Sequence, residues 1–130
     1  MAEYDDDLED LLRLSLVRGL GPVRLGRCRQ QLGSAQSILS ASQAQLARVR
    51  GIGAKAAGKI HRSIHEDAGP AAVRRQRETI DRLGIDLVAI GDERYPRLLT
   101  MISDPPPLLY VRGRMEPTDA LSLAIVGSRR

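Results

Sequence analysis

A seven-residue segment of this chain occurs twice, and this repeat constrains the fold more than any other feature. Residues 17–23 read VRGLGPV, and residues 49–55, which lie 32 positions later, read VRGIGAK. In each copy two glycines flank one apolar residue, between stretches with helical patterning. Glycine permits backbone angles that other residues avoid, and its missing Cβ lets a partner come close. Each copy therefore predicts a hairpin that ends one helix and begins the next.

The two hairpins predict a site for anions. The apolar residue between the glycines would hold each hairpin to the core, and the N–H groups that begin the following helix would point outward. Such a site grips phosphates without touching base edges, so binding should depend on salt and tolerate any sequence. The residues that we expect to bind nucleic acid are Gly19, Gly21, Arg24, Gly51, Ile52, Gly53 and Lys55. Further positive charge would come from Arg18, Arg50 and Lys59.

The charges are segregated along the chain, although the net charge is only +4. Residues 1–10 hold six acids and no base, whereas residues 11–65 hold ten Lys or Arg and no acid. Ten acids balance ten bases in residues 66–130. A concentrated positive field attracts polyanions. A solvated basic face, or a face that pairs with the acidic N-terminus, would explain the same segregation.

Local signals divide the first part of the chain into short helices. Pro22 suits the first turn of a helix that Gly33 ends. Ser34 and Ser42 are candidate N-caps, and Ser42 with Gln45 fits a capping box. Leucines at helical spacing mark an earlier helix. The predicted helices cover residues 8–16, 22–32, 54–66 and, as a polar linker, 71–83.

The second part of the chain has the texture of an α/β domain. Strands are predicted over residues 85–90 and 108–112, with a short helix over 96–102. The apolar run 121–126 is typical of a third strand, buried on both faces of a parallel sheet. We therefore expect an all-α domain over 1–68, a linker helix over 69–84 and the start of an α/β domain over 85–130. Three strands and one short helix cannot cover both faces of a sheet, so we expect a fragment or truncated copy of a longer protein.

The end of the third predicted strand offers a second candidate site. There the run reaches Gly127, Ser128 and Arg129, at a strand-to-helix turn where doubly wound folds bind phosphate. The glycine would allow close approach, the hydroxyl could donate a hydrogen bond, and the guanidinium could clamp a phosphate. An ordinary turn with solvated arginines is the alternative. The dinucleotide fingerprint GxGxxG is absent, so no nicotinamide or flavin cofactor is expected.

Two resemblances carry these interpretations further. The second hairpin copy resembles the helix-hairpin-helix pattern of SAM-like domains, whereas the first departs from it at Pro22 and Gly26 and is expected mainly to hold the pair together. Residues 95–99 (YPRLL), 104–113 (DPPPLLYVRG) and 124–129 (AIVGSR), placed after such a helical domain, resemble the DNA-processing protein A family (DprA, also called Smf). The family resemblance covers nearly the whole chain.

The family resemblance implies a fold, a function and partners. It implies an α+β chain whose second domain is Rossmann-like, with Gly127, Ser128 and Arg129 in a positive pocket for single-stranded DNA. It also implies a recombination mediator that loads the RecA recombinase in natural transformation and forms a homodimer at full length. Duplex DNA is a further expected partner, through the hairpins. Two alternatives stay open, a helical protein-interaction module and a Rossmann-like nucleotide-processing hydrolase.

Other side chains give no sign of catalysis or of a metal. The single Cys28 excludes an internal disulfide and lies on an apolar face, as a core residue would. His61 and His65 have a spacing that a metal could use, but no matching ligands accompany them. Asp92 and Glu93 follow a strand without a partner base. We expect a soluble cytoplasmic protein that is not an enzyme, has no cofactor and no metal, and does not bind a membrane.

Overall fold

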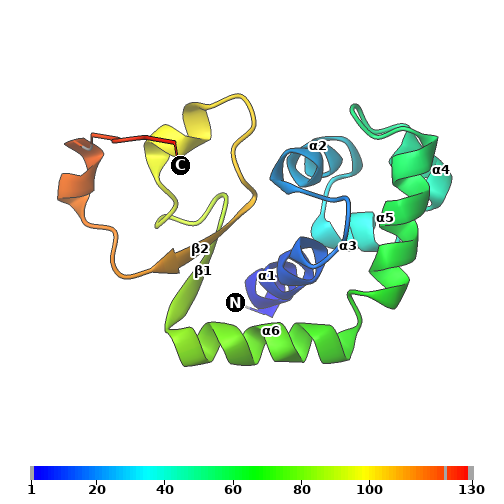
Figure 1. Ribbon diagram of the computed structural model, residues 1–130, viewed down its shortest axis with the longest axis horizontal. Coiled ribbons are helices and arrows are strands. Elements are labelled where there is room, and N and C mark those ends of the chain that lie inside the picture. Colours follow the sequence, from blue (N-terminus) through cyan, green and yellow to red (C-terminus); the bar gives the residue numbers. More distant parts are fainter. Residues whose placement is uncertain (1, 122, 129–130) are drawn as a thin grey trace.

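The computed structural model describes residues 2–121 and 123–128, in which a bundle of helices adjoins a small sheet (Figure 1). None of the helices over residues 2–121 is long and apolar enough to span a membrane. The helices are α1 (Ala2–Ser15), α2 (Pro22–Leu32), α3 (Ala35–Leu39), α4 (Gln43–Ala47), α5 (Ala54–Glu66) and α6 (Pro70–Leu83). The remaining elements are strands β1 (Ile85–Ala89) and β2 (Leu108–Arg112) and the 3-10 helices η1 (Arg97–Met101) and η2 (Pro117–Leu121).

The helix boundaries have local causes in the sequence. Gly33 ends α2 with a φ of 95°, and its N–H donates to the carbonyl of Arg29 at 3.0 Å. Ser42 caps α4, because its Oγ accepts a hydrogen bond from the Gln45 N–H at 3.1 Å. In return the Gln45 side chain accepts from the Ser42 N–H at 2.8 Å. The glycine stop and the capping box are both confirmed.

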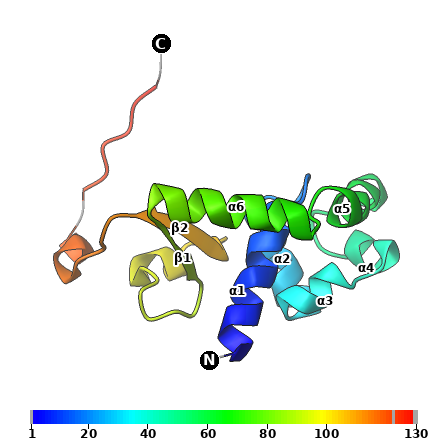
Figure 2. The same ribbon diagram turned by 90° about the horizontal axis from the view of Figure 1, so that it is seen from below.

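Helix α1 lies at the centre of the molecule, between two apolar clusters. Leu11 and Leu14 are fully buried in the main cluster, to which all of the helices α1–α5 contribute. Leu12 is also fully buried but faces the other way, toward α6 and β1. Figure 2 shows α6 running past α1, with the other helices toward one end and the sheet toward the other. The second cluster consists of Leu12, Val73, Ile80 and Leu87.

The sequence repeat is also a repeat of burial. Positions 32 residues apart are buried in both copies, and these pairs are Leu14 and Leu46, Val17 and Val49, Leu20 and Ile52, Leu25 and Ala57, and Cys28 and Ile60. The two copies also cover each other. A Cβ on Gly19 would lie 3.5 Å from Ile60 and 3.8 Å from Lys59, and one on Gly51 would overlap the guanidinium of Arg27. Arg27 and Lys59 are themselves 32 positions apart, so each hairpin lies under the matching residue of the other copy.

The two predicted strands form, but they pair antiparallel. In the register of β1 and β2, Ile85 is opposite Arg112 and Ala89 is opposite Leu108. Ala89 belongs to the main cluster, and Ser15 Oγ and Tyr110 Oη lie 2.7 Å apart, so the sheet packs on the helices. A parallel pair needs a crossover of a dozen residues or more, usually a helix, and residues 90–107 provide only a short 3-10 turn. The expected Rossmann-like domain is therefore not confirmed.

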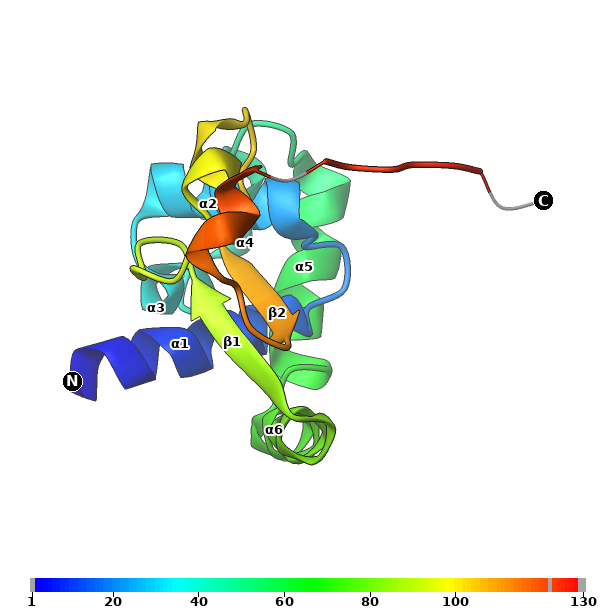
Figure 3. The ribbon, with the colours of Figure 1, turned by 90° about the vertical axis from the view of Figure 1, so that its left-hand side faces the viewer.

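The third predicted strand is wrong over the part of residues 121–126 that the structure describes. Leu121 ends η2, and residues 123–128 are extended without a strand partner (Figure 3). Leu121, Leu123, Ile125 and Val126 are between 88% and 96% exposed. An apolar run of this kind forms a buried strand only when neighbouring strands and helices cover it, and the described residues place none there. Ser122 lies outside the described residues.

The buried thiol of Cys28 makes stability depend on alkaline pH. Burial raises the pKa of Cys28 to about 11, whereas a thiol in an unfolded chain titrates near pH ~8.5. Between these values only the unfolded chain gains stability by losing the proton, so the free energy of unfolding should fall by about 2 kcal/mol as the pH rises from 8 to 11. Urea titrations of the wild type and of Cys28→Ala isolate this contribution, because Lys and Tyr are common to both. Equal pH dependence in the two proteins would contradict it.

Candidate nucleic-acid interface

The two hairpins have the same backbone conformation. Hairpin 1 (residues 17–23) and hairpin 2 (residues 49–55) both have a φ of +84° at their first glycine, Gly19 or Gly51. The second glycine of each, Gly21 or Gly53, is extended and forms the N-cap of the following helix. Side chains rarely adopt the first of these conformations, so the repeat requires glycine there. The prediction of paired hairpins that each end one helix and begin another is confirmed.

The apolar residue between the glycines anchors each hairpin. Leu20 and Ile52 are both only 4% exposed and belong to the main cluster. The Ile52 N–H donates to the carbonyl of Val49 at 2.9 Å, which tightens hairpin 2. Ile52 therefore holds the hairpin from below, and the backbone of its neighbours would meet a ligand. Its own side chain is not accessible to one.

The helix starts differ in what they offer to an anion. The first N–H groups of a helix have no partner within it, and neither Gly21 nor Gly53 supplies a side-chain cap. At the start of α2 one of these donors is missing, because Pro22 has no N–H. At the start of α5 the corresponding residue is Ala54, so hairpin 2 keeps the full set of donors. The positive end of the α5 dipole adds to their attraction for a phosphate.

The basic side chains of the first copy are engaged within the protein. Two of them donate to backbone carbonyls, Arg13 Nε to Ala68 at 2.7 Å and Arg24 Nη1 to Gly19 at 2.9 Å. The other three form ion pairs, namely Arg18 with Asp67 at 3.6 Å, Arg27 with Asp104 at 3.8 Å and Arg29 with Asp7 at 3.5 Å. Arg24, which we expected to add charge to a phosphate site, therefore folds back on its own hairpin.

The basic side chains of the second copy are exposed and unengaged. Within residues 7–121 and 123–128, none of them has an ion pair or a side-chain hydrogen bond. We call this set the hairpin-2 cations, and its members are Arg48, Arg50, Lys55, Lys59 and Arg62. The ten bases of the acid-free segment thus divide by copy into an engaged set and a free set. The free set surrounds the hairpin whose helix keeps all of its donors.

The helix that follows each hairpin also differs in what covers it. On α2, a Cβ at Gly26 would lie 3.8 Å from the carbonyl oxygen of Pro105 and 3.9 Å from Pro107, so the proline segment covers this face. On α5 the matching position, Gly58, meets only the side chain of Gln43. A groove is open there beside hairpin 2, lined by Gln43, Gly53, Ala54, Lys55, Ala56, Gly58, Lys59 and Arg62. Hairpin 2 is therefore accessible where hairpin 1 is covered.

The second candidate site lies far from the hairpins. Gly127 and Ser128 are exposed in the extended segment 123–128, and a Cβ on Gly127 would meet no atom within 4 Å. Figures 1 and 2 place this segment at the opposite end of the molecule from α5. Arg129 lies outside the described residues. The structure does not bring these residues together with the hairpins.

The histidine pair is on α5, close to hairpin 1. The ring centroids of His61 and His65 are 4.8 Å apart, with the rings at 65° to each other. Over the described ranges, no group of three or more His, Cys, Asp or Glu could hold a metal.

Two basic residues of this interface, Arg48 and Arg62, escaped the sequence analysis. Arg62 could have been found, because Lys55, Lys59 and Arg62 recur at positions i, i+4 and i+7 and so share one helix face. Arg48 had no such signal. Neither did the engagement of the first copy, because Arg27 and Arg29 find their acids far away in the sequence.

Comparisons with known proteins divide the chain at the same place. Residues 8–66 match a family model described as a SAM-like helix-hairpin-helix tandem, and residues 86–130 match one described as DNA recombination-mediator protein A. Protein Smf of Synechocystis is 30% identical over 122 residues, which are 91% of this chain and 30% of that protein. Protein Smf of Borreliella burgdorferi is 36% identical over 58 residues, 45% of this chain and 18% of that protein. The chain thus spans less than a third of either relative. No solved structure gives a significant match.

Proposed function

This chain belongs to the DprA/Smf family, as an N-terminal portion of it, and from that premise we propose that it binds DNA for a recombination mediator through hairpin 2. The observation that carries this proposal is the division of the basic residues. All five hairpin-2 cations are free, whereas the five bases of the first copy are engaged within the protein. Free cations beside unpaired helix N–H groups suit a phosphate.

The chemistry of hairpin 2 favours backbone contacts over base contacts. Its donors are main-chain N–H groups, and Lys55 stands at the second position of the helix. These groups recognise phosphate oxygens, which are the same for every sequence. Binding should therefore be insensitive to base sequence and should weaken as salt rises.

The finer parts of the proposed function rest on the family. We assign single-strand binding also to Gly127, Ser128 and Arg129, and we assign to the full-length protein the loading of RecA and the formation of a homodimer. The described residues support the backbone-binding part through hairpin 2. A protein-interaction role for the helical part is the competing proposal, and it predicts no DNA affinity at low salt. No enzymatic step is part of the proposal.

Gly53→Ala tests whether DNA approaches hairpin 2 closely. Gly53 is extended, with a φ of −98°, and a Cβ there would meet no atom within 4 Å, so stability should change by less than about 0.5 kcal/mol. A phosphate backbone seated on the N–H groups would, however, meet that Cβ. We expect the affinity for DNA to fall about tenfold, which corresponds to ~1.4 kcal/mol. Fluorescence anisotropy at low salt measures it.

Gly21→Ala is the matched control in hairpin 1. Gly21 has the same extended conformation and the same open space, with no atom within 4 Å. Because hairpin 1 offers neither free cations nor the full set of N–H donors, this change should leave the affinity unaltered. If the Gly53→Ala protein is folded and binds DNA as the wild type does, hairpin 2 is not the contact.

A further inference from the structure

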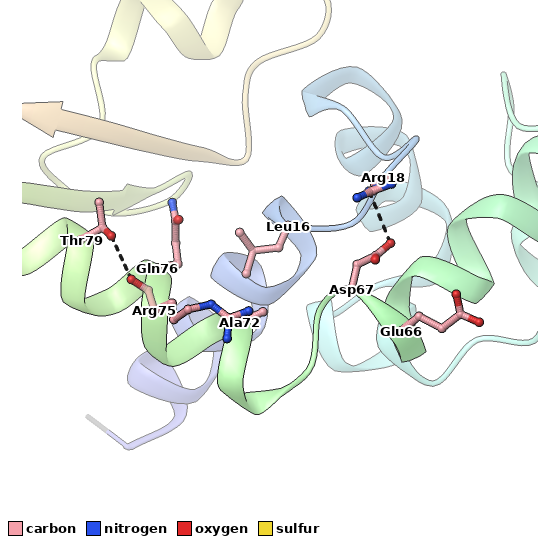
Figure 4. Close-up of a pocket in the computed structure, with 8 residues that line it drawn as sticks. All are labelled: Leu16, Arg18, Glu66, Asp67, Ala72, Arg75, Gln76 and Thr79. Carbon is pink, nitrogen blue, oxygen red and sulfur yellow. Dashed lines mark hydrogen bonds and ion pairs between the residues drawn. The ribbon is translucent and has the colours of Figure 1, made fainter.

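Hairpin 2 opens into a longer hollow that follows α5. Its groove shares Lys59 and Arg62 with a second hollow that also involves Arg18 of hairpin 1. That hollow shares Arg18, Glu66 and Asp67 with a third one, which lies between hairpin 1 and α6 (Figure 4). The surface is therefore hollowed continuously from hairpin 2 along α5 to hairpin 1. We call the part between Lys55 and Arg18 the α5 groove.

The α5 groove carries a row of free cations. Lys55, Lys59 and Arg62 lie on one face of α5, and at 1.5 Å per residue they span about 10 Å. This length corresponds to about three nucleotides along one strand of a duplex, at ~3.4 Å each. The stem of Lys59 lies against Gly19, 3.8 Å from where a Cβ would be, so the middle cation stands next to hairpin 1.

A buried serine fixes the far end of the groove. Ser63, only 3% exposed, accepts a hydrogen bond from the Arg18 N–H at 2.8 Å and donates one to Asp67 Oδ2 at 2.8 Å. Asp67 also pairs with the Arg18 side chain, which is 76% exposed. With the neighbouring Glu66, this carboxylate places negative charge beyond Arg62. The row of cations therefore ends at Arg18, where a phosphate backbone would be repelled from going further.

The sequence around the groove indicates which nucleic acid it suits. Between Tyr4 and Tyr95 the chain has no Tyr, and it has no Trp or Phe at all. Proteins that hold single strands commonly stack the bases on aromatic side chains, which are absent here. A duplex keeps its bases stacked internally and presents only phosphates to such a surface. We infer that the α5 groove holds the phosphate backbone of one strand of a duplex, from hairpin 2 to Arg18, and this inference rests on the proposed function.

The dependence of duplex binding on salt tests this inference. Each phosphate contact contributes about 0.9 to the slope of log K against log[salt] for a duplex. Removing one contact with Arg62→Gln, in the full chain, should lower the slope by about that amount while binding through hairpin 2 persists. Arg82→Gln is the control, because Arg82 is exposed on the last turn of α6, away from the groove, and removes the same charge. Its slope should equal that of the wild type.

The probes are a 20-base-pair duplex and a single strand of the same length and sequence. The inference expects the duplex to bind more tightly, and the slope to change only for Arg62→Gln. If Arg62→Gln and Arg82→Gln give the same slope while Gly53→Ala still weakens binding, the groove is not used and the proposed function survives. If the single strand binds as tightly as the duplex, the assignment to a duplex is overturned. If Gly53→Ala has no effect either, the proposed function has failed as well.

Discussion

Replacing Lys55, Lys59 and Arg62 together by glutamate is expected to lower the affinity for duplex DNA about a thousandfold at low salt. Each of these side chains is exposed and, within the described part of the chain, free of acidic partners. A hydrogen bond to a charged group contributes about 1.5 kcal/mol or more, so losing three such contacts accounts for this factor. Because the three residues lie on the exposed face of α5, the fold should be retained. Fluorescence anisotropy measures the affinity, and circular dichroism checks the fold.

A matched triple variant separates position from net charge. Arg74, Arg82 and Arg97 are also exposed, and their replacement by glutamate changes the net charge by the same amount. They lie on α6 and η1, outside the α5 groove. The control should lose much less affinity than the α5 variant, through the weakened long-range field alone. Equal losses in the two variants would mean that the chain binds DNA only through its overall charge.

Ile60→Ala is expected to have the largest effect on stability. Ile60 is fully buried in the main cluster, and it lies 3.5 Å from where a Cβ on Gly19 would be. Truncating a buried isoleucine leaves a cavity and typically costs ~2–5 kcal/mol, a large part of the stability of a small domain. Because Ile60 joins α5 to hairpin 1, the cavity would open between the two copies of the repeat. Urea titration measures the loss.

Two further variants keep this prediction testable. If Ile60→Ala does not fold, Ile60→Val should still fold and cost about 1 kcal/mol. Val23→Ala is the control, because Val23 is 42% exposed on α2 and its truncation should cost less than about 0.5 kcal/mol. A loss for Ile60→Val no greater than that for Val23→Ala would contradict the central place of Ile60 in the core.

The helical half could be predicted because its signals are local. Gly33 stops α2 and Gln45 completes the cap of α4, and each acts within a few residues of the boundary that it sets. The strands β1 and β2 were also predicted in place. Their antiparallel pairing was not, because pairing joins Ile85 to Arg112 across the intervening chain. The exposed run at residues 121–126 was misread for the same reason, since burial of a strand depends on its neighbours.

The candidate site was predictable in outline and not in detail. The glycines and Lys55 follow from the repeat alone, and the structure gives both hairpins one conformation. The difference between the copies depends on side chains brought together by the fold. Arg29 finds Asp7 on α1, and Arg27 finds Asp104 in the proline segment. No pattern within either copy of the repeat announces these partners.

The way in which the two copies cover each other makes them mutually dependent. Arg27 of the first copy lies over Gly51 of the second, and Lys59 of the second lies over Gly19 of the first. Neither half of the repeat therefore completes its own hairpin, and severing the chain between α2 and α3 would leave each half with an uncovered turn. Mutational tolerance follows the same logic. A bulky substitution in one hairpin would be felt in the helix of the other, so the pair has to change in concert.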